Sequence, residues 1–228
     1  MACLDNITLA NYDDEDIFDI VAKLETSFAI KFDERAFITV KTFGDLCRII
    51  ESHINHDNKE GCTKQQAFYK IRLAISETIL IDKGLVNLDS KLADFFPRHN
   101  RRTLIKKFRG QLGISLKLLT YPNWIALTLT IGVLSSLIAF FFDWKIAVSG
   151  SAFFILAFKV ADILGKEFKF ETVKEVTEYA ATEHYIDVRR SKFTVNRNEI
   201  LATIKDAFST GLLLDKEQLT PDAKFNWA

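Results

Sequence analysis

Along most of this chain, apolar residues recur at spacings of three and four, which is the pattern of one face of an α-helix. Between residues 15 and 32 this face follows four acidic residues, which favour a helix start. Thr42 to Asp45 has the form of a capping box, and the apolar face after it predicts a helix through Ile54. Further helices are predicted over residues 34–37, 64–80, 100–113, 171–181 and 198–208.

One stretch is apolar on all sides instead. Residues 124–142 contain no charge, and a helix of that length spans about 28 Å, close to the ~30 Å hydrocarbon layer of a bilayer. A second apolar run, residues 146–158, reaches a full span when it continues through Leu164, which includes Lys159 and Asp162. We therefore predict a transmembrane helical hairpin. The alternative is a buried hairpin in the core of a soluble protein.

Details of the two runs favour a pair of helices in close contact. Lys159 and Asp162 are three residues apart and could pair on one helical face. Trp124 and Trp144 lie where interfacial aromatic residues are expected. Both runs also contain small residues, which let two helices approach closely: Gly132, Ser135, Ser136, Ala139, Ser149, Gly150, Ser151 and Ala152.

The flanks of the hairpin predict its orientation. Basic residues gather before and after it, whereas its short turn holds one lysine and one aspartate. The positive-inside tendency then places both termini in the cytoplasm, so we expect an integral membrane protein, in the inner (cytoplasmic) membrane if it is bacterial. We expect no cleavable signal peptide. Three widely spaced cysteines, Cys3, Cys47 and Cys62, favour a reducing compartment over a disulfide framework.

Composition and charge change this picture mainly through their position. The chain has 228 residues, 48% of them apolar, and 30 basic against 30 acidic residues, which excludes a disordered chain and a uniformly basic nucleic-acid binder. Residues 1–60 carry 13 acidic and 6 basic residues, whereas residues 61–119 carry 4 acidic and 12 basic residues. We predict four segments: an acidic one (1–60), a basic one (61–119), the hairpin (120–166) and a C-terminal helical one (167–228).

The N-terminal helices resemble part of the acyl carrier protein family. Residues 16–34 (DIFDIVAKLETSFAIKFDE) are similar to the second helix of these proteins and its exit, and residues 38–46 (ITVKTFGDL) to the start of their last helix. The resemblance covers about a fifth of the chain. It implies an all-α fold: small carrier-like helical bundles, here joined to the transmembrane hairpin.

One departure from the family concerns its cofactor. The family carries an Asp-Ser-Leu motif at the start of the second helix, and its serine receives the phosphopantetheine arm. The matching positions are Asp13, Asp14 and Glu15, so Asp14 occupies the serine position. A carboxylate cannot serve as the acceptor hydroxyl, and we expect no cofactor. The acidic start is either a charged helix terminus without a partner or a partner-docking face formed by Asp13, Asp14, Glu15, Asp16 and Asp19.

Two later segments resemble the first half of the same fold. Residues 64–113 contain a helix, a loop with the sequence LDSKLADFFP, and a second helix that Asn100 is expected to cap and Gly113 to end. Residues 198–225 are similar to the family's first helix and the loop after it. We therefore hypothesise that residues 198–208 pack against residues 17–54 and complete one carrier-like bundle, with the middle segments inserted between its parts.

Chemical motifs are sparse. The chain has no glycine-rich nucleotide motif, no phosphate loop, no Gly-x-Ser-x-Gly and no His-Glu-x-x-His. Cys47, His53, His56 and Cys62 are the only cluster of soft ligands, and their spacing is too wide for a usual zinc site, so we expect no metal. We expect a non-enzymatic protein.

A basic cluster precedes the hairpin, with six cations within residues 98–109. Several interpretations stay open: a solvated face that sets topology, contact with anionic lipid headgroups, or pairing with an acidic protein surface. Nucleic acid is not expected, because aromatic residues do not interleave with the cations. The candidate headgroup contacts are Arg98, Arg101, Arg102, Lys106, Lys107 and Arg109.

Together these patterns predict a membrane-anchored adaptor with a degenerate carrier-like domain. Its acidic helix face would dock a protein with a basic surface, for example an enzyme that reads carrier proteins. The alternative function is an accessory role in a membrane lipid or envelope pathway, with the basic helix on anionic headgroups. The sequence predicts neither the partner's identity nor the oligomeric state.

Overall fold

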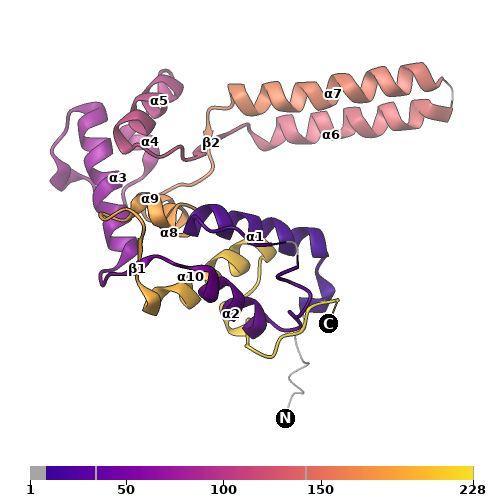
Figure 1. Ribbon diagram of the computed structural model, residues 1–228. Helices are drawn as coiled ribbons and strands as arrows, with labels where there is room; N and C mark the ends of the chain where they lie inside the picture. Colours follow the sequence, from indigo (N-terminus) through magenta and orange to yellow (C-terminus); the bar gives the residue numbers. More distant parts are fainter. Residues whose placement is uncertain (1–8, 34, 142, 228) are drawn as a thin grey trace, which may run out of the picture. The chain divides into compact units, whose positions relative to one another are not determined.

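The computed structural model describes residues 9–33, 35–141 and 143–227 (Figure 1). The all-α prediction is confirmed, because helices dominate and each strand has only two residues. The α-helices are α1 (Asp14–Phe28), α2 (Phe43–His53), α3 (Thr63–Ile79), α4 (Leu92–Phe95), α5 (Arg101–Leu112), α6 (Asn123–Ile138), α7 (Trp144–Leu164), α8 (Val173–Glu183), α9 (Tyr185–Val188) and α10 (Arg197–Leu212).

Short elements connect these helices. The strands β1 (Asp57–Asn58) and β4 (Thr194–Val195) pair in parallel, and β2 (Leu119–Thr120) and β3 (Glu167–Phe168) pair antiparallel. The 3₁₀ helices are η1 (Leu9–Asn11), η2 (Lys83–Leu85), η3 (Ala139–Phe141) and η4 (Lys216–Gln218).

The chain divides into two compact units. The first contains the residues up to Ile71 and those from Thr177 onward, and the second contains Arg72–Val176. The boundaries therefore fall inside α3 and α8, not between the four segments that charge and hydropathy had suggested. A change in composition marks a change of surroundings, whereas a compact unit is defined by contacts that join distant parts of the chain.

The core of the first unit is formed by helices from the N-terminal and the C-terminal parts of the chain. Helix α10 packs against α1 and α2, so the structure places residues 198–208 beside residues 17–54. Apolar residues of α1 meet those of α2 and α10 in one cluster, where Phe43 and Phe208 contact edge to face at 5.2 Å. The buried residues include Ile17, Leu24, Phe28, Leu46, Ile50, Ile200, Ile204 and Leu219.

Local signals fix the ends of α1 and α2. Asp13 caps α1, and Ala29 ends it in the left-handed region with φ of 51°. The capping box at Thr42 and Asp45 is confirmed, since each residue bonds the other's backbone N–H. The brief helix predicted over residues 34–37 is wrong for its described part. Residues 35–39 form successive turns with i to i+3 hydrogen bonds, and Glu34 lies outside the described residues.

The second unit packs its helices around aromatic side chains. Phe96, after α4, contacts Phe108 of α5 edge to face at 5.7 Å. Gly113 ends α5 with φ of 72°, as predicted. Asn100 occupies the N-cap position of α5, but its side chain makes no capping bond there. A separate contact ties α5 to the end of α3: the Lys107 ammonium donates to the Thr78 carbonyl at 3.0 Å.

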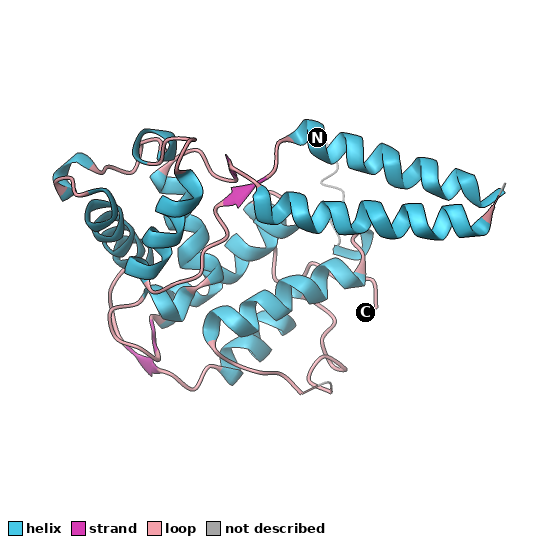
Figure 2. Ribbon diagram, turned by 90° about the horizontal axis from the view of Figure 1, so that it is seen from above, coloured by secondary structure: helices cyan, strands magenta, loops and turns pink. Residues whose placement is uncertain are grey.

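Helices α6 and α7 lie side by side in both views (Figures 1 and 2). Both are long and apolar enough to cross a membrane, over Asn123–Phe141 and Ala147–Leu164, and only 6% of either stretch is buried. Between them, the hydroxyls of Ser136 and Ser151 hydrogen bond at 3.0 Å. Phe142, at the predicted end of the first span, lies outside the described residues.

The base of the helix pair is closed by a short stem. Leu119 pairs with Phe168 and Thr120 with Glu167 in the antiparallel β2–β3 ladder. The Asp162 carboxylate, which could have paired with Lys159, accepts instead from Lys117 at 2.8 Å. Lys117 lies just before β2, so this ion pair joins the incoming chain to the end of α7.

Candidate functional site

The acidic start of α1 is the first candidate site. Asp13 caps the helix by accepting a hydrogen bond from the Glu15 backbone at 3.3 Å. Asp14 is half-buried, and its Oδ1 has no hydrogen-bond partner within the described residues. Glu15, Asp16 and Asp19 are exposed. The acids near the helix start are favoured by the helix dipole, and the exposed carboxylates remain open to a partner.

Several cations of the basic cluster, residues 98–109, already have partners within the protein. Arg101 is one of the candidate headgroup contacts, yet it is only 7% exposed. Its guanidinium donates to the carbonyls of Phe96 and Lys166 and lies 4.2 Å from the centre of the Phe168 ring. Burial lowers the pKa of Arg101. This residue therefore fastens the stem to α5 and is withdrawn from any headgroup.

Other members of the cluster also have internal partners. Arg98 forms an ion pair with Glu167 of β3 at 2.7 Å. Arg109 donates from Nε to the Leu116 carbonyl at 2.7 Å. Arg102 and Lys106 are exposed and one helical turn apart. They are the cations of the cluster best placed for an external anion.

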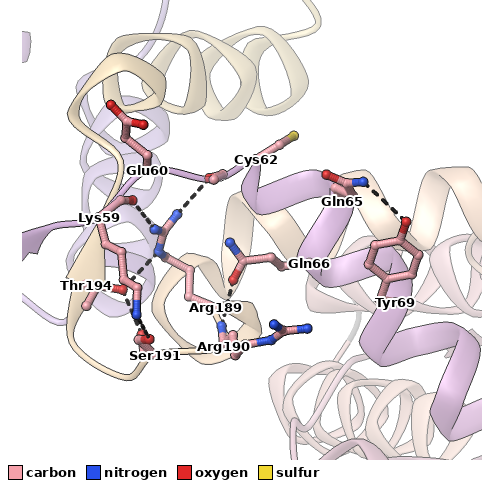
Figure 3. Close-up of a pocket in the computed structure, with 11 residues that line it drawn as sticks. Lys59, Glu60, Cys62, Gln65, Gln66, Tyr69, Arg189, Arg190, Ser191 and Thr194 are labelled. Atoms are coloured by element: carbon pink, nitrogen blue, oxygen red, sulfur yellow. Dashed lines mark hydrogen bonds between the residues drawn. The ribbon is translucent and has the colours of Figure 1, made fainter.

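A polar network around Arg189 forms a further site, which the sequence analysis missed (Figure 3). Arg189 follows α9 and is only 2% exposed. Its Nε donates to the Thr194 hydroxyl at 3.2 Å, and its Nη1 to the Thr63 hydroxyl at 2.8 Å and the Gly61 carbonyl at 3.3 Å. Nη2 donates to the Lys59 carbonyl. The guanidinium thus joins the segment before α3 to the segment before α10.

A carboxylate completes this network. Glu199 of α10 accepts from the Thr63 hydroxyl at 2.7 Å and from the Tyr185 hydroxyl at 3.4 Å, and it lies 4.0 Å from Arg189. The Tyr185 hydroxyl accepts from the Asn196 backbone at 3.0 Å, and burial raises the pKa of Tyr185. The contacts of Arg189 with Gly61 and Thr63, and of Glu199 with Thr63, join residues more than 120 positions apart, so no local sequence signal could reveal them.

A pocket of about 340 Å³ opens beside this network, between the start of α3 with the residues before it and the segment 189–194. Arg189 lines it, as do Lys59, Gln66 and Ser191. Its polar groups serve one another: Lys59 donates to the Ser191 hydroxyl at 2.7 Å, and Gln66 accepts from the Arg190 backbone at 2.7 Å. Because the donors of Arg189 are directed at protein acceptors, the arrangement suits a structural clamp better than an anion site.

The cysteines and histidines do not converge. Burial raises the pKa of the Cys47 thiol to about 12, whereas Cys62 is exposed. His53 and His56 bond the carbonyls of Ile49 and Phe28 at 2.9 and 2.7 Å. Within the described residues, no group of three or more His, Cys, Asp or Glu side chains could hold a metal ion. Cys3 lies outside the described residues.

Comparisons with known proteins identify no relative of this chain. No family model, no curated protein and no solved structure matches the chain. The features that bear on function are the exposed apolar helix pair, the acidic start of α1 and the basic cluster of residues 98–109.

Proposed function

We propose that this protein is an integral membrane protein in which the α6–α7 hairpin anchors a non-enzymatic helical interaction module. One observation carries the proposal: the apolar side chains of both helices face outward. Trp124, Leu127, Ile131, Leu134, Leu137, Ile138, Phe140, Phe141, Trp144, Val148, Phe153, Ile155, Leu156, Ile163 and Leu164 are all more than half exposed.

The energetics favour a bilayer around these helices. Burying one large apolar side chain is worth roughly 1.5–3 kcal/mol, so fifteen of them in water would be strongly unfavourable. The contact between the helices uses small residues instead. A Cβ on Gly150 would lie 2.9 Å from the Ser136 Cβ, and Ser136 also bonds Ser151. Close approach at small residues is typical of helix packing in lipid.

The interaction module in this proposal is a degenerate carrier-like bundle made of α10, α1 and α2. Support comes from their shared core and from the residues that resemble acyl carrier proteins. Asp14 at the serine position excludes the phosphopantetheine ester there. Glu15, Asp16 and Asp19 form an exposed acidic surface on α1, which suits a protein partner with a basic surface.

Membrane insertion is tested by alkaline carbonate extraction of membranes that contain the full chain. The protein should stay in the pellet and require detergent for release. Orientation is tested with the Cys3→Ser/Cys47→Ser variant, in which Cys62 is the remaining thiol. A membrane-impermeant maleimide should label it only after the cytoplasmic face is opened. Release by carbonate would refute the anchor, and labelling of intact cells would refute the orientation.

Partner docking is tested by affinity purification in mild detergent with identification of the bound proteins. The variant Glu15→Lys/Asp16→Lys/Asp19→Lys should lose its specific partner, because the charge of the docking surface is reversed. A matched control, Glu51→Lys/Glu217→Lys/Asp222→Lys, reverses three exposed acids elsewhere in the first unit and should keep the partner. Equal capture by both variants would exclude the acidic surface as the docking site.

A second candidate function is contact with anionic headgroups through α5. The exposure of Arg102 and Lys106, in the unit that carries the hairpin, favours it. The full chain, reconstituted in vesicles of mixed anionic and zwitterionic lipid and re-extracted, should retain anionic lipid preferentially. Arg102→Gln/Lys106→Gln should remove this preference, and an unchanged lipid ratio would refute the headgroup role.

A further inference from the structure

Two loops far apart in the chain share their residue positions and their hydrogen bonds. One follows α3 and the other follows α10, 133 positions later. Each begins with a leucine in the left-handed region: Leu80 has φ of 59° and Leu213 has φ of 55°. In each, a serine of the preceding helix donates to the next carbonyl, Ser76 to Ile81 and Ser209 to Leu214. A bulky residue with positive φ is uncommon, so its recurrence at one register is informative.

The match continues through both loops. Each has an aspartate before a 3₁₀ helix, then a fully buried aliphatic residue, Val86 in one and Leu219 in the other. The loops end at buried Leu92 and Phe225, again 133 positions apart. Five of the thirteen aligned positions are identical: Leu80 and Leu213, Asp82 and Asp215, Lys83 and Lys216, Asp89 and Asp222, and Lys91 and Lys224.

Each loop binds the start of a helix in the same way. The first two amides of α2, on Phe43 and Gly44, donate to Ala223 and Pro221 at 2.8 and 2.9 Å. The first two amides of α8 donate to the corresponding loop carbonyls, Ser90 and Leu88, at 3.0 and 2.8 Å. Isolated bridges join Thr42 to Lys224 and Thr172 to Lys91.

The helix starts bound by these loops are capped alike. Asp45 accepts from the Lys41 amide at 3.1 Å, and Glu175 accepts from the Glu171 amide at 2.9 Å. The two carboxylates are 130 positions apart, as are the two amides. The threonine between them, Thr42 or Thr172, accepts from the backbone of the same acidic residue.

The remaining helices correspond too. Helices α1 and α5 both end at a residue with positive φ, Ala29 and Gly113, which are 84 positions apart. At the same separation, the buried positions of α1 match those of α5: Val21 with Ile105, Leu24 with Phe108, and Phe28 with Leu112. Each of the two helices is followed, after a connection, by the capped helix described above.

We infer that the chain contains two copies of one helical bundle, and that the hairpin is an insertion in the second copy. The first copy consists of α10, its loop, α1 and α2, so its first helix stands at the C-terminal end. The second copy consists of α3, its loop, α5 and α8. The connection before the capped helix consists of residues 30–41 in the first copy and of residues 114–171 in the second. The second connection is longer because it contains the stem, α6 and α7.

The two copies use the corresponding position differently. In the second copy Arg98, which lies in the turn before α5 and matches Asp14 at the start of α1, is bound to Glu167 of the hairpin stem. The second copy therefore holds the anchor, and the first copy keeps its exposed carboxylates for a partner. The statement about the partner rests on the proposed function, whereas the repeat and the insertion do not.

The repeat is tested by exchanging one loop for the other in the full chain. Residues 81–91 are replaced by the sequence of residues 214–224. The melting temperature in mild detergent should stay within a few degrees of the parent, because each buried position and each carbonyl acceptor is preserved. The control variant receives residues 213–223, shifted by one position, and should melt much lower because Leu219 no longer falls at the site of Val86. Equal and large losses in both variants would overturn the equivalence.

The insertion is tested by replacing residues 121–164 with a four-residue Gly/Ser linker. Thr120 and Glu167 are paired in the stem, so a short connection can join the two sides. The variant should be soluble without detergent and should unfold cooperatively. An aggregated or non-cooperative product would overturn the insertion. This readout is folding, so it is independent of membrane orientation and partner capture, which test the proposed function.

Discussion

Gly165, between α7 and the stem, gives the sharpest test of how the helix pair is attached to the second unit. A Cβ at this position would lie 2.3 Å from the Thr120 carbonyl oxygen and 2.8 Å from the Tyr121 nitrogen. The backbone of Gly165, with φ of −52° and ψ of 141°, suits any L-residue. The substitution Gly165→Ala therefore tests the close approach of two chain segments without adding backbone strain.

The atoms that an added Cβ would meet are backbone atoms of Thr120 and Tyr121. Backbone cannot rotate aside as a side chain can, so the stem must open by roughly 1 Å to bring the Cβ to an ordinary contact distance. Overpacking of this kind costs about 1–3 kcal/mol. For a chain of this length, 1 kcal/mol moves the melting temperature by about 2–4 °C. We expect Gly165→Ala to lower the melting temperature of the chain by about 2–12 °C.

The measurement is thermal unfolding of the purified full chain in mild detergent, followed by circular dichroism. Gly110→Ala is the matched control. Gly110 lies in α5 with nothing within 4 Å of an added Cβ, and alanine is favoured over glycine in a helix by about 1 kcal/mol. The control should melt at the same or a higher temperature. If Gly165→Ala melts with the parent, the stem is not closely packed and the argument fails.

Three further predictions follow from buried polar groups. Arg101→Met should destabilise the second unit by about 3 kcal/mol in the same assay, because two carbonyls lose a charged donor. A loss of stability below about 1 kcal/mol would contradict the role of Arg101 in holding the stem. Arg189→Met should lower the free energy of unfolding by about 3–5 kcal/mol, because the acceptors of the network are left unpaired. The control Arg190→Met changes an exposed arginine and should leave the free energy of unfolding nearly unchanged. Equal effects of the two substitutions would contradict the structural role of Arg189. Cys47 stays protonated when folded, with a pKa of about 12, but ionises near pH 8.5 when unfolded. Stability should therefore fall as pH rises above about 8.5, more steeply in the parent than in Cys47→Ala; parallel profiles in urea titrations would refute this.

Features with a local cause could be read from the sequence. The capping box at Thr42 depends on two side chains three residues apart, and the end of α5 depends on one glycine. The apolar helix pair also has a local signature, because an unbroken uncharged run does not depend on distant contacts. Each of these signals is complete within a few turns of helix, which is why the pattern alone located it.

The candidate sites depend on distant contacts and were harder to predict. Charge patterning marked Arg101 as a surface cation, because sequence shows a charge but not the carbonyls and the aromatic ring that surround it. Arg189 drew no attention, since its partners Gly61 and Thr63 lie more than 120 residues earlier. The same reasoning explains the unit boundaries, which lie inside continuous helices.

The polar contacts of the stem show that the helix pair is attached rigidly and not through a flexible tether. A tether needs only a linker, and a buried arginine in it would cost free energy without benefit. Here Arg101 donates to the Lys166 carbonyl, in the segment between α7 and β3. Lys117 pairs with Asp162, and Arg98 with Glu167. The first and third of these contacts join α5 and the turn before it to the outgoing side of the stem, and the second joins the incoming chain to the end of α7. The hairpin is therefore held as part of the second unit.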